Sequence, residues 1–285
     1  MVIAGPTAAG KSAYALRLAA AERGTIINAD ASQLYAEIPV LSAAPSVADR
    51  ARVPHRLYGP VDGAHACSAA AWAAMAEGEI DAALADRRLP IVVGGTGLYL
   101  RTLIDGIAAV PPIDDAVRSA VRALEPADAY AALSREDPAA AARLGPADRQ
   151  RTMRALEVVR ATGRPLSDWQ RAATGGIAAR HAVEGIVLDA PRADLHARIA
   201  RRFEAMIAGG ALAEVERLAA RGLDPALPVM KALGVPELLA MIAGRTTLAE
   251  ATAAALLATR RYAKRQQTWF RNQTPDWPRH TDGAV

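Results

Sequence analysis

The sequence has a single cysteine and few aromatic residues. Because Cys67 is the only thiol among 285 residues, the chain can form no internal disulfide and no cysteine metal cluster. The five histidines form no pair with metal-ligand spacing, so the sequence predicts no zinc site. Aromatic residues make up 4% of the chain, and alanine contributes much of its 52% hydrophobic content, which favours helices.

Long hydrophobic runs are also absent. No stretch of about eighteen apolar residues occurs, so the sequence contains no candidate membrane span. Residues 1–4 lead directly into a glycine-rich loop and leave no room for a signal peptide. We therefore expect a cytoplasmic protein with no membrane partner.

Acidic residues are scarce in two segments of the chain. Between Arg143 and Arg171 there are seven arginines and three acidic residues, and residues 256–271 contain five basic residues and no acid. The whole chain has a net charge of +4 and a pI of about 9.5. Clustered positive charge favours a polyanionic partner such as nucleic acid, and solvated helix faces would give the same pattern.

The most specific motif present is a phosphate-binding loop of the form G-x-x-x-x-G-K-[ST], preceded by an apolar strand and followed by a helix. Its residues are Gly5, Pro6, Thr7, Ala8, Ala9, Gly10, Lys11 and Ser12. Glycines let backbone N–H groups turn inward around phosphate oxygens at a helix N-terminus. Lys11 would supply a charge to the phosphates, and Ser12 a hydroxyl for Mg²⁺.

Apolar strands alternate with helices in the first hundred residues. Strands are expected at residues 1–4, 25–28 and 90–94, with helices at 11–21 and 68–86 between them. This order predicts an α/β protein with a P-loop NTPase-like parallel sheet flanked by helices. Asp30 and Thr96 follow two of the strands, so both should lie with the phosphate loop at the carboxyl edge of the sheet.

The middle of the chain lacks the alternation of strands and helices. Residues 114–171 read as helical, with turn signals at Asp137-Pro138, Gly145-Pro146 and Gly163, before a strand returns at residues 183–188. We expect an all-helical insertion at 111–179 within a core formed by residues 1–110 and 180–272. The tail after Asn272 contains two prolines and reads as a loose end.

The machinery for hydrolysing a nucleoside triphosphate is missing. ATP is the usual ligand of such a loop, but these enzymes also need a metal-associated Asp at a buried strand end and a group that positions water. The third strand ends in glycines instead, and Asp30 is the one carboxylate well placed at a strand end. Asp30 is then available as a general base, and the phosphate end of the ligand would be a leaving group.

Seven ordered motifs resemble the tRNA dimethylallyltransferase (tRNA isopentenyltransferase) family over nearly the whole chain. They are residues 5–12, 28–35, 53–57, 94–99 and 148–157, then Arg202-Phe203 with Met206, and residues 259–266 with 268–270. The resemblance implies transfer of a dimethylallyl group from dimethylallyl diphosphate to N6 of the adenine 3′-adjacent to the anticodon in tRNA.

The resemblance also assigns a task to the motif residues. The loop would hold the diphosphate, with Lys11 and Mg²⁺ neutralising the charge that develops on the leaving group. Asp30 would accept the N6 proton, because an aromatic amine is a weak nucleophile until it loses one. Thr96 would place a hydroxyl near the reacting groups.

Arg202 can be examined by helical periodicity. A helix from Leu195 places Ile199, Phe203 and Met206 on one face, and Arg202 falls within that apolar stripe. A buried arginine needs an anion, and the diphosphate or a core carboxylate would satisfy it.

Contacts to the tRNA anticodon stem-loop are implied by the resemblance alone. The adenine must leave its stack to meet Asp30, and Gln33 could read its edge. The implied tRNA-binding residues are Asp30, Ala31, Ser32, Gln33, Thr96, Arg118, Gln150, Arg151, Thr152, Met153, Arg154, Lys231, Arg261, Lys264 and Arg265. The family usually has Ser at position 31, Lys at position 44 and an aromatic residue after Gly234, so these departures affect the expected RNA contacts.

Other functions share parts of this pattern. A P-loop small-molecule kinase would use the same loop and Mg²⁺ but consume ATP. A transferase acting on free adenine nucleotides would share the chemistry without needing two basic segments. A non-catalytic RNA-binding module would leave Asp30 unexplained. Enclosing one RNA stem-loop fits a monomer.

Overall fold

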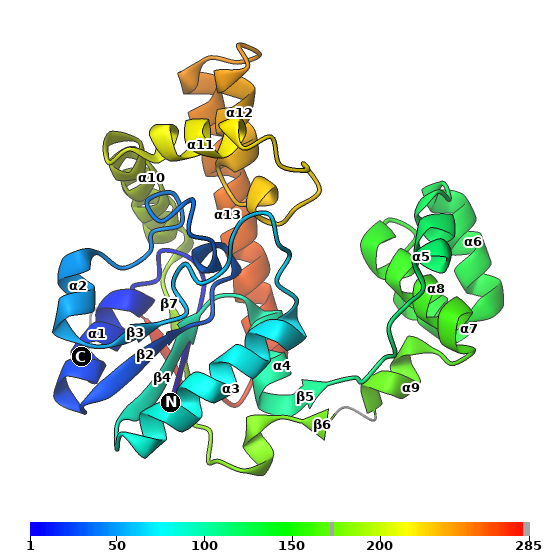
Figure 1. The fold of residues 1–285 in the computed structure, drawn as a ribbon, viewed down its shortest axis with the longest axis horizontal. Helices are drawn as coiled ribbons and strands as arrows, with labels where there is room; N and C mark the ends of the chain where they lie inside the picture. The colour runs from blue at the N-terminus through cyan, green and yellow to red at the C-terminus, as the bar shows by residue number, and fades with distance from the viewer. Residues whose placement is uncertain (172–173, 282–285) are drawn as a thin grey trace. The chain divides into compact units, whose positions relative to one another are not determined.

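The computed structural model describes residues 1–171 and 174–281. It contains a six-stranded sheet in the order β3-β2-β4-β1-β7-β8, in which every neighbouring pair is parallel (Figure 1). The strands are β1 Val2–Ala4, β2 Gly24–Asn28, β3 His55–Arg56, β4 Leu89–Gly94, β7 Gly185–Asp189 and β8 Arg279–Thr281. The predicted parallel α/β sheet is therefore confirmed.

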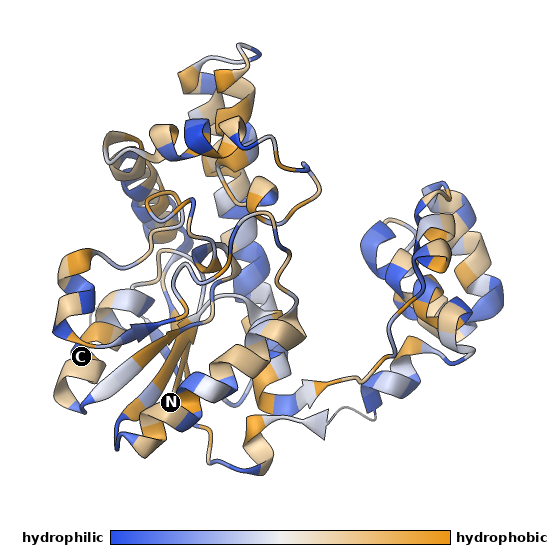
Figure 2. Cartoon of the chain, viewed as in Figure 1, coloured by the Kyte–Doolittle hydropathy of each residue, from blue (hydrophilic) through white to orange (hydrophobic). Residues whose placement is uncertain are grey.

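The central strands are buried on both faces, as their sequences require. In β4, the run Ile91, Val92 and Val93 is buried throughout, and so is every residue of β1. Ile3 of β1 lies opposite Val93 on one side and Ile186 on the other. Figure 2 shows the hydrophobic colour concentrated on these strands. Parallel strands that are covered on both faces need such continuous apolar runs.

Helices flank the sheet, and capping residues mark where several begin. The Ser68 side chain accepts from the N–H of Ala71 at the start of α3, as its sequence predicts. The helices outside the insertion are α1 Lys11–Ala21, α2 Val47–Arg52, α3 Ala69–Ala85, α4 Gly97–Asp105, α10 Arg192–Ala208, α11 Ala211–Ala220, α12 Val235–Ile242 and α13 Leu248–Gln273, with 3-10 turns η1 Ala31–Leu34 and η3 Val229–Lys231. Across the described ranges, no helix combines the length and apolarity needed to span a membrane.

A second hydrophobic core joins the C-terminal helices to the loop after η1. Phe203 of α10 packs in a cluster with Leu41 of that loop and Val235 of α12. The carboxylate of the buried Glu214 in α11 accepts from the N–H groups of Val40 and Leu41, at 2.8 and 2.9 Å. Because a buried carboxylate needs such donors, Glu214 fixes the loop that forms one wall of the site described below.

The sequence-based prediction is wrong for the tail. Residues 279–281 are not a loose end but form β8, which pairs with β7 in register with residues 187–189. The indole of Trp277 packs on Gly185, where a Cβ would lie 2.3 Å from the ring. Arg279 also donates to the carbonyl of Phe270 at 2.9 Å. This pairing joins residues about ninety positions apart, and local turn signals such as Pro275 do not predict it.

The insertion forms a separate compact unit. The chain divides into Met1–Ile104 with Arg180–Val285, and Asp105–Ala179, so the insertion begins at Asp105 rather than at 111. Its elements are β5 Gly106–Ile107, α5 Asp115–Arg122, α6 Pro126–Glu136, α7 Pro138–Arg143, α8 Arg149–Thr162, α9 Leu166–Arg171, β6 Thr174–Gly175 and η2 Ile177–Ala179. Val121, Leu133 and Leu156 lie at its core among small alanines. Prolines begin α6 and α7, and Gly163 ends α8.

Candidate active site

The glycine-rich loop between β1 and α1 depends on two glycines for its backbone geometry. Gly5 has a φ of 143°, and a Cβ there would lie 2.1 Å from the carbonyl oxygen of Leu188 in β7. Gly10 has a φ of 89° and immediately precedes α1. The first turn of α1 has N–H groups without helical partners, and these carry the positive end of the helix dipole. The loop is therefore built to bind an anion.

Lys11 places a cation beside this loop at the first position of α1. Its Nζ donates to the carbonyl oxygen of Pro6 at 2.7 Å. Burial lowers the pKa of the Lys11 ammonium to about 8, while the negative charge of Asp30 opposes the fall and the positive charge of Arg202 adds to it. Because this cation is poorly solvated, it gains more from an incoming anion than an exposed lysine would.

Asp30 follows β2 and is held by a buried asparagine. The Oδ1 of Asn28 accepts from the N–H of Asp30 at 2.8 Å, and its Nδ2 donates to the carbonyls of Asp30 and Leu57 at 3.0 and 2.9 Å. The indole N–H of Trp72 donates to the Asn28 carbonyl at 2.9 Å. One carboxylate oxygen of Asp30 accepts from the N–H of Ser32 at 3.0 Å. These bonds fix both the backbone and the side chain of Asp30.

Thr96 lies at the end of β4, beside the turn that carries Asp30. Its hydroxyl accepts from the N–H of Ala31 at 3.1 Å and lies near the hydroxyl of Tyr262 in α13. A Cβ at the preceding Gly94 would lie 2.1 Å from the carbonyl oxygen of Ala29, so the close approach of the two strand ends requires glycine there. Thr96 thus supports the Asp30 turn.

Arg202 reaches the phosphate loop from α10. Its guanidinium donates to the hydroxyl of Thr7, a neutral group, rather than to the core carboxylate that a purely structural role would require. Burial lowers the pKa of the Arg202 guanidinium, and the charge of Asp30 opposes this change. The apolar stripe expected around it is present, since Ile199, Phe203 and Met206 are all buried.

Two adjoining hollows meet at these residues. The first is lined mainly by the phosphate loop and the start of α1, including Ala8, Gly10, Lys11 and Ser12. The second, which we call the apolar hollow, has apolar residues along half of its lining: Ile38, Leu41, Ile199, Phe203, Met206, Ala232 and Leu233. Four residues line both hollows: Thr7, Asp30, Ser42 and Arg202. An anion site therefore opens onto a partly apolar chamber, with a carboxylate at the junction.

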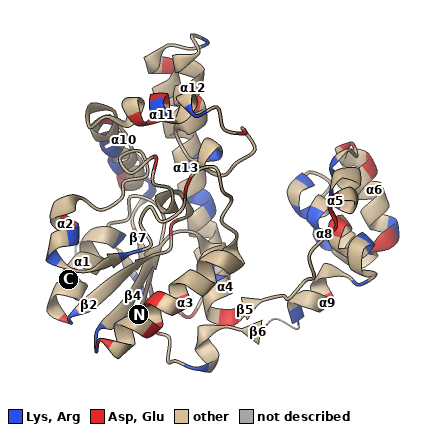
Figure 3. Cartoon of the chain, in the orientation of Figure 1, with Lys and Arg blue, Asp and Glu red and all other residues tan. Residues whose placement is uncertain are grey.

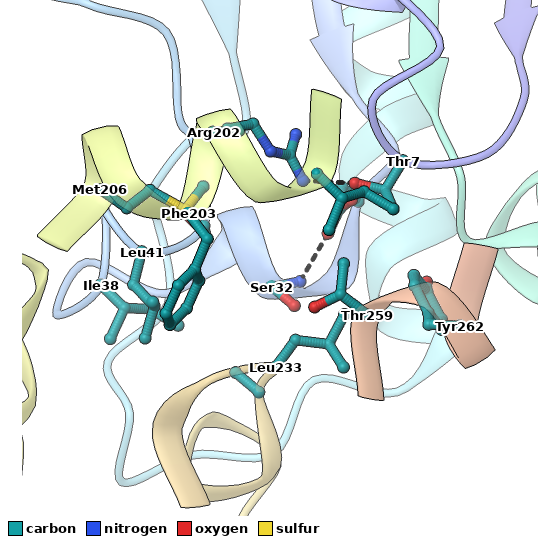
Figure 4. Close-up of a pocket in the computed structure, with 14 residues that line it drawn as sticks. Thr7, Ser32, Ile38, Leu41, Arg202, Phe203, Met206, Leu233, Thr259 and Tyr262 are labelled. Carbon is teal, nitrogen blue, oxygen red and sulfur yellow. Dashed lines mark hydrogen bonds between the residues drawn. The ribbon is translucent and has the colours of Figure 1, made fainter. Parts of the chain in front are cut away.

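Figure 4 shows how the apolar hollow is arranged. Arg202 and Thr7 lie at one end, whereas the ring of Phe203 lies beside Leu41 at the other. Gly234 adjoins this apolar end, because a Cβ there would lie 3.0 Å from Leu41 and 3.4 Å from the Phe203 ring. Arg202 and Thr7 thus lie apart from the Phe203 ring, with Ser32 and Thr259 between them and Leu233.

The sequence and the fold both match known proteins. The family described as IPP transferase matches residues 33–273, and the family described as isopentenyl transferase matches residues 1–64. The chain belongs to the IPP transferase family.

Two members of the IPP transferase family are similar to this chain over nearly the whole length of both proteins. A tRNA dimethylallyltransferase of Sphingopyxis alaskensis is 59% identical over 99% of the chain and 92% of the relative. Its counterpart in Erythrobacter litoralis is 55% identical over 98% and 90%. Among solved structures, the tRNA isopentenylpyrophosphate transferase of Bacillus halodurans is 31% identical with a TM-score of 0.70, covering 100% of this chain and 90% of that one. A eukaryotic dimethylallyltransferase acting on tRNA is 25% identical with a TM-score of 0.83, covering 98% and 73%.

The structure shows what the residues after Asp30 contact in this IPP transferase family chain. Both amide protons of Gln33 are used within the protein, because its Nε2 donates to the carbonyls of Ser42 and Ala43 at 3.0 and 2.8 Å. Only its Oε1 can therefore meet a base. Ala31 engages Thr96 through its backbone N–H, so the departure from the usual serine leaves that bond intact. Of the other departures, Pro236 lies in the first turn of α12, where proline is tolerated.

The predicted RNA-contacting residues of the insertion fall into two groups. Four lie at or near the surface: Arg118 pairs with Asp115 at 2.9 Å, Gln150 is exposed, Arg151 pairs with Asp148 at 3.2 Å and Arg154 lies 3.6 Å from Glu157. Two others face inward, since Thr152 is 1% exposed and Met153 packs against the core of the insertion. A buried hydroxyl cannot contact RNA, so we leave Thr152 out of the proposed contacts.

The C-terminal helix carries its predicted basic residues on the surface. Arg261, Lys264 and Arg265 are exposed on α13, and Lys231 is exposed at η3. Figure 3 shows the blue of Lys and Arg on α13, and on α8 of the insertion. The guanidinium of Arg265 lies over the ring of Tyr262.

The sequence reasoning missed several residues that line the two hollows, among them three with hydroxyl groups. Tyr58 and Ser42 line the phosphate-side hollow, and Tyr262 lines the apolar one. Burial and the nearby charge of Asp30 raise the pKa of both tyrosine hydroxyls. Tyr262 belongs to the matching segment 259–266, so its place in a motif was the available signal. Tyr58 and Ser42 lie in loops whose course only the tertiary structure determines.

Proposed function

We propose that this chain transfers a dimethylallyl group from dimethylallyl diphosphate to N6 of the adenine 3′-adjacent to the anticodon in tRNA, releasing diphosphate. The observation that carries the proposal is the meeting of an anion site and an apolar chamber at Asp30. A prenyl diphosphate has this same division into a charged and an apolar half. Relatives named tRNA dimethylallyltransferase support the proposal.

The phosphate loop binds the diphosphate in this proposal. N–H groups of the loop and of the start of α1 surround its oxygens, and Lys11 and Arg202 line the same hollow as Asp30. As the bond between carbon 1 and oxygen breaks, negative charge grows on the departing diphosphate. Cations that are already held in place stabilise that charge without reorganisation.

The apolar hollow takes the dimethylallyl group. Its aliphatic and aromatic walls remove the five-carbon chain from water, which is worth about 25 cal/mol for each Å² of apolar surface buried. Binding the chain there directs carbon 1 toward Arg202 and Thr7, at the junction of the two hollows (Figure 4).

Asp30 acts as the base at that junction. The bond from N6 to carbon 1 forms, the bond from carbon 1 to the diphosphate oxygen breaks, and the N6 proton moves to the Asp30 carboxylate. The hydrogen bond from Ser32 and the clamp by Asn28 hold the carboxylate in position, which supplies the orientation that proton transfer needs. Thr96 supports the same turn through Ala31.

Magnesium is the proposed metal ion. The donor set fits an ion that keeps most of its waters, because the chain offers the exposed Ser12 hydroxyl beside a loop suited to diphosphate oxygens. Within residues 1–171 and 174–281, no group of three or more His, Cys, Asp or Glu could hold a metal by itself. When bound, Mg²⁺ would neutralise part of the diphosphate charge.

The basic surfaces of the two units are the proposed contacts to the tRNA anticodon stem-loop. On α13 these are Arg261, Lys264 and Arg265, and Lys231 at η3 adds a further charge. In the insertion they are Arg118, Gln150, Arg151 and Arg154. Such side chains contact phosphates and orient the RNA, whereas Ala31, Ser32 and the Oε1 of Gln33 lie next to the base that reacts. We further propose that the protein acts as a cytoplasmic monomer.

The kinase alternative explains less of the site. A phosphoryl acceptor carries hydroxyl or carboxylate groups that need polar partners, whereas half of the residues that line the hollow next to the phosphate loop are apolar. An acceptor limited to free adenine nucleotides would not need exposed basic residues on both α8 and α13.

The direct test combines purified protein, Mg²⁺, labelled dimethylallyl diphosphate and unmodified tRNA with adenine at the target position. We expect label on the RNA, removed when that adenine is replaced by guanine. One parallel reaction contains ATP with the same RNA and tests for kinase activity. Another contains labelled dimethylallyl diphosphate with AMP and tests for transfer to a free nucleotide. Formation of ADP, or label on AMP but not on RNA, would overturn the proposal.

A further inference from the structure

A buried glutamine on α13 connects the two sides of the site without lining either hollow. Gln266 is 4% exposed, and its side chain lies between the phosphate loop and the loop that follows β4. Its Oε1 accepts from the N–H of Thr7 at 2.9 Å, and its Nε2 donates to the carbonyl of Gly95 at 2.9 Å. Both ends of the amide are therefore used, each toward a different strand end.

The fit around this amide is close. A Cβ at Gly95 would lie 2.1 Å from the Nε2 of Gln266, so the loop can accept the amide only because position 95 is glycine. The two contacts also fix which end of the amide is oxygen, since the N–H of Thr7 can only donate and the carbonyl of Gly95 can only accept.

Each contact leads on to a group with a role in the proposed reaction. Thr7, held through its backbone by Gln266, receives the hydrogen bond of Arg202 on its hydroxyl. On the other side, Tyr262 of the same helix adjoins Gln266 and Thr96, and Thr96 supports the turn of Asp30. One helix face therefore fixes the loop that would hold the leaving group and the turn that carries the base.

We propose that Gln266 is a positioning residue that sets the spacing between the diphosphate-binding loop and the Asp30 base. This inference rests on the function proposed above. Because Gln266 lines neither hollow, it acts through Thr7, Gly95 and Tyr262 rather than on the substrates. Its loss should therefore lower the rate of transfer much more than it weakens tRNA binding.

Two substitutions of Gln266 separate its hydrogen bonds from its volume. Gln266→Met keeps the length of the side chain and removes both bonds. Gln266→Glu keeps the shape, and its carboxyl reproduces both the acceptor and the donor only while it is protonated. The matched control is Gln267→Met on the same helix, which removes a single hydrogen bond to Asp189 at 2.8 Å and none to the phosphate loop.

The readouts are kcat, KM for tRNA, the melting temperature and the affinity for inorganic diphosphate by calorimetry. A displacement of about 1 Å at a reacting group can cost about a hundredfold in rate. We therefore expect Gln266→Met to lower kcat about a hundredfold, with KM for tRNA within about twofold of the wild type and a weaker affinity for diphosphate. The melting temperature of Gln267→Met should fall by an amount similar to that of Gln266→Met, but its kcat should equal that of the wild type.

The pH profile gives a result that a structural role would not. The kcat of Gln266→Glu, relative to wild type, should rise as the pH falls and the carboxyl takes up its proton. Any of three results would overturn the inference. The ratio of the kcat of Gln266→Glu to that of wild type could stay constant with pH, the kcat of Gln266→Met could lie within about threefold of wild type, or Gln266→Met and Gln267→Met could lose equal amounts of kcat. If the wild type transfers no label, the proposed function fails, and Gln266 is then judged on diphosphate affinity in the same three variants.

Discussion

Replacing Lys11 should make the ligand-free protein more stable while removing its affinity for diphosphate. Lys11 holds its charge in a poorly solvated position beside the phosphate loop, where burial brings its pKa from the ordinary 10.5 to about 8. The folded state therefore binds this proton less tightly than the unfolded state does. At about 1.4 kcal/mol per pH unit, the difference corresponds to a cost of roughly 3 kcal/mol.

The size of the effect depends on pH in a defined direction. The cost is fully present below about pH 8, where both states carry the proton, and it is lost as the pH rises toward 10.5 because the folded state then releases the proton first. Lys11→Met also loses the hydrogen bond to Pro6, worth about 1 kcal/mol, so we expect a net gain of about 2 kcal/mol at pH 7. By about pH 10 the gain should have disappeared.

Urea unfolding of wild type and Lys11→Met at pH 7 and pH 10 measures this difference, with Lys264→Met as the control for an exposed lysine. The control should change stability by less than about 0.5 kcal/mol. Calorimetry with inorganic diphosphate should show binding to the wild type and none to Lys11→Met. A variant less stable than wild type at pH 7, or a difference that does not narrow as the pH rises, would refute the reasoning.

Four further predictions concern other parts of the molecule. Asp30→Ala should abolish prenyl transfer yet keep diphosphate binding in calorimetry; near-normal turnover would mean that another group takes the N6 proton. Phe203→Ala should lower the free energy of unfolding by roughly 3 kcal/mol, because the buried ring is lost. It should also raise the ratio of geranyl to dimethylallyl transfer, because the ring lies at the apolar end of the hollow; an unchanged ratio would mean that the prenyl group binds elsewhere. Replacing Arg261 and Lys264 by alanine should weaken tRNA binding and flatten its dependence on salt, measured by filter binding, and an unaltered salt slope would contradict a phosphate contact. Trp277→Ala should lower the melting temperature by several degrees, because it uncovers Gly185 beside β7; an unchanged value would show that β8 contributes little to stability.

The sequence by itself determined the fold class, the family and much of the candidate site. Continuous apolar strands, the glycine-rich loop and capping residues such as Ser68 act through neighbours in the sequence, and these local effects can be read in order along the chain. Helical periodicity placed Arg202 on an apolar face for the same reason, and the structure has it donating to Thr7 of the phosphate loop.

Tertiary structure alone decided how distant segments meet. The pairing of β8 with β7 contradicts the loose tail that local turn signals indicated. The amide of Gln33 is used by its own loop, and Thr152 faces the core of the insertion. The link from Gln266 to Thr7 spans 259 positions, and no local pattern predicts which of two adjacent glutamines turns inward. Contacts of this range depend on how whole elements pack, so they become visible only when the chain has folded.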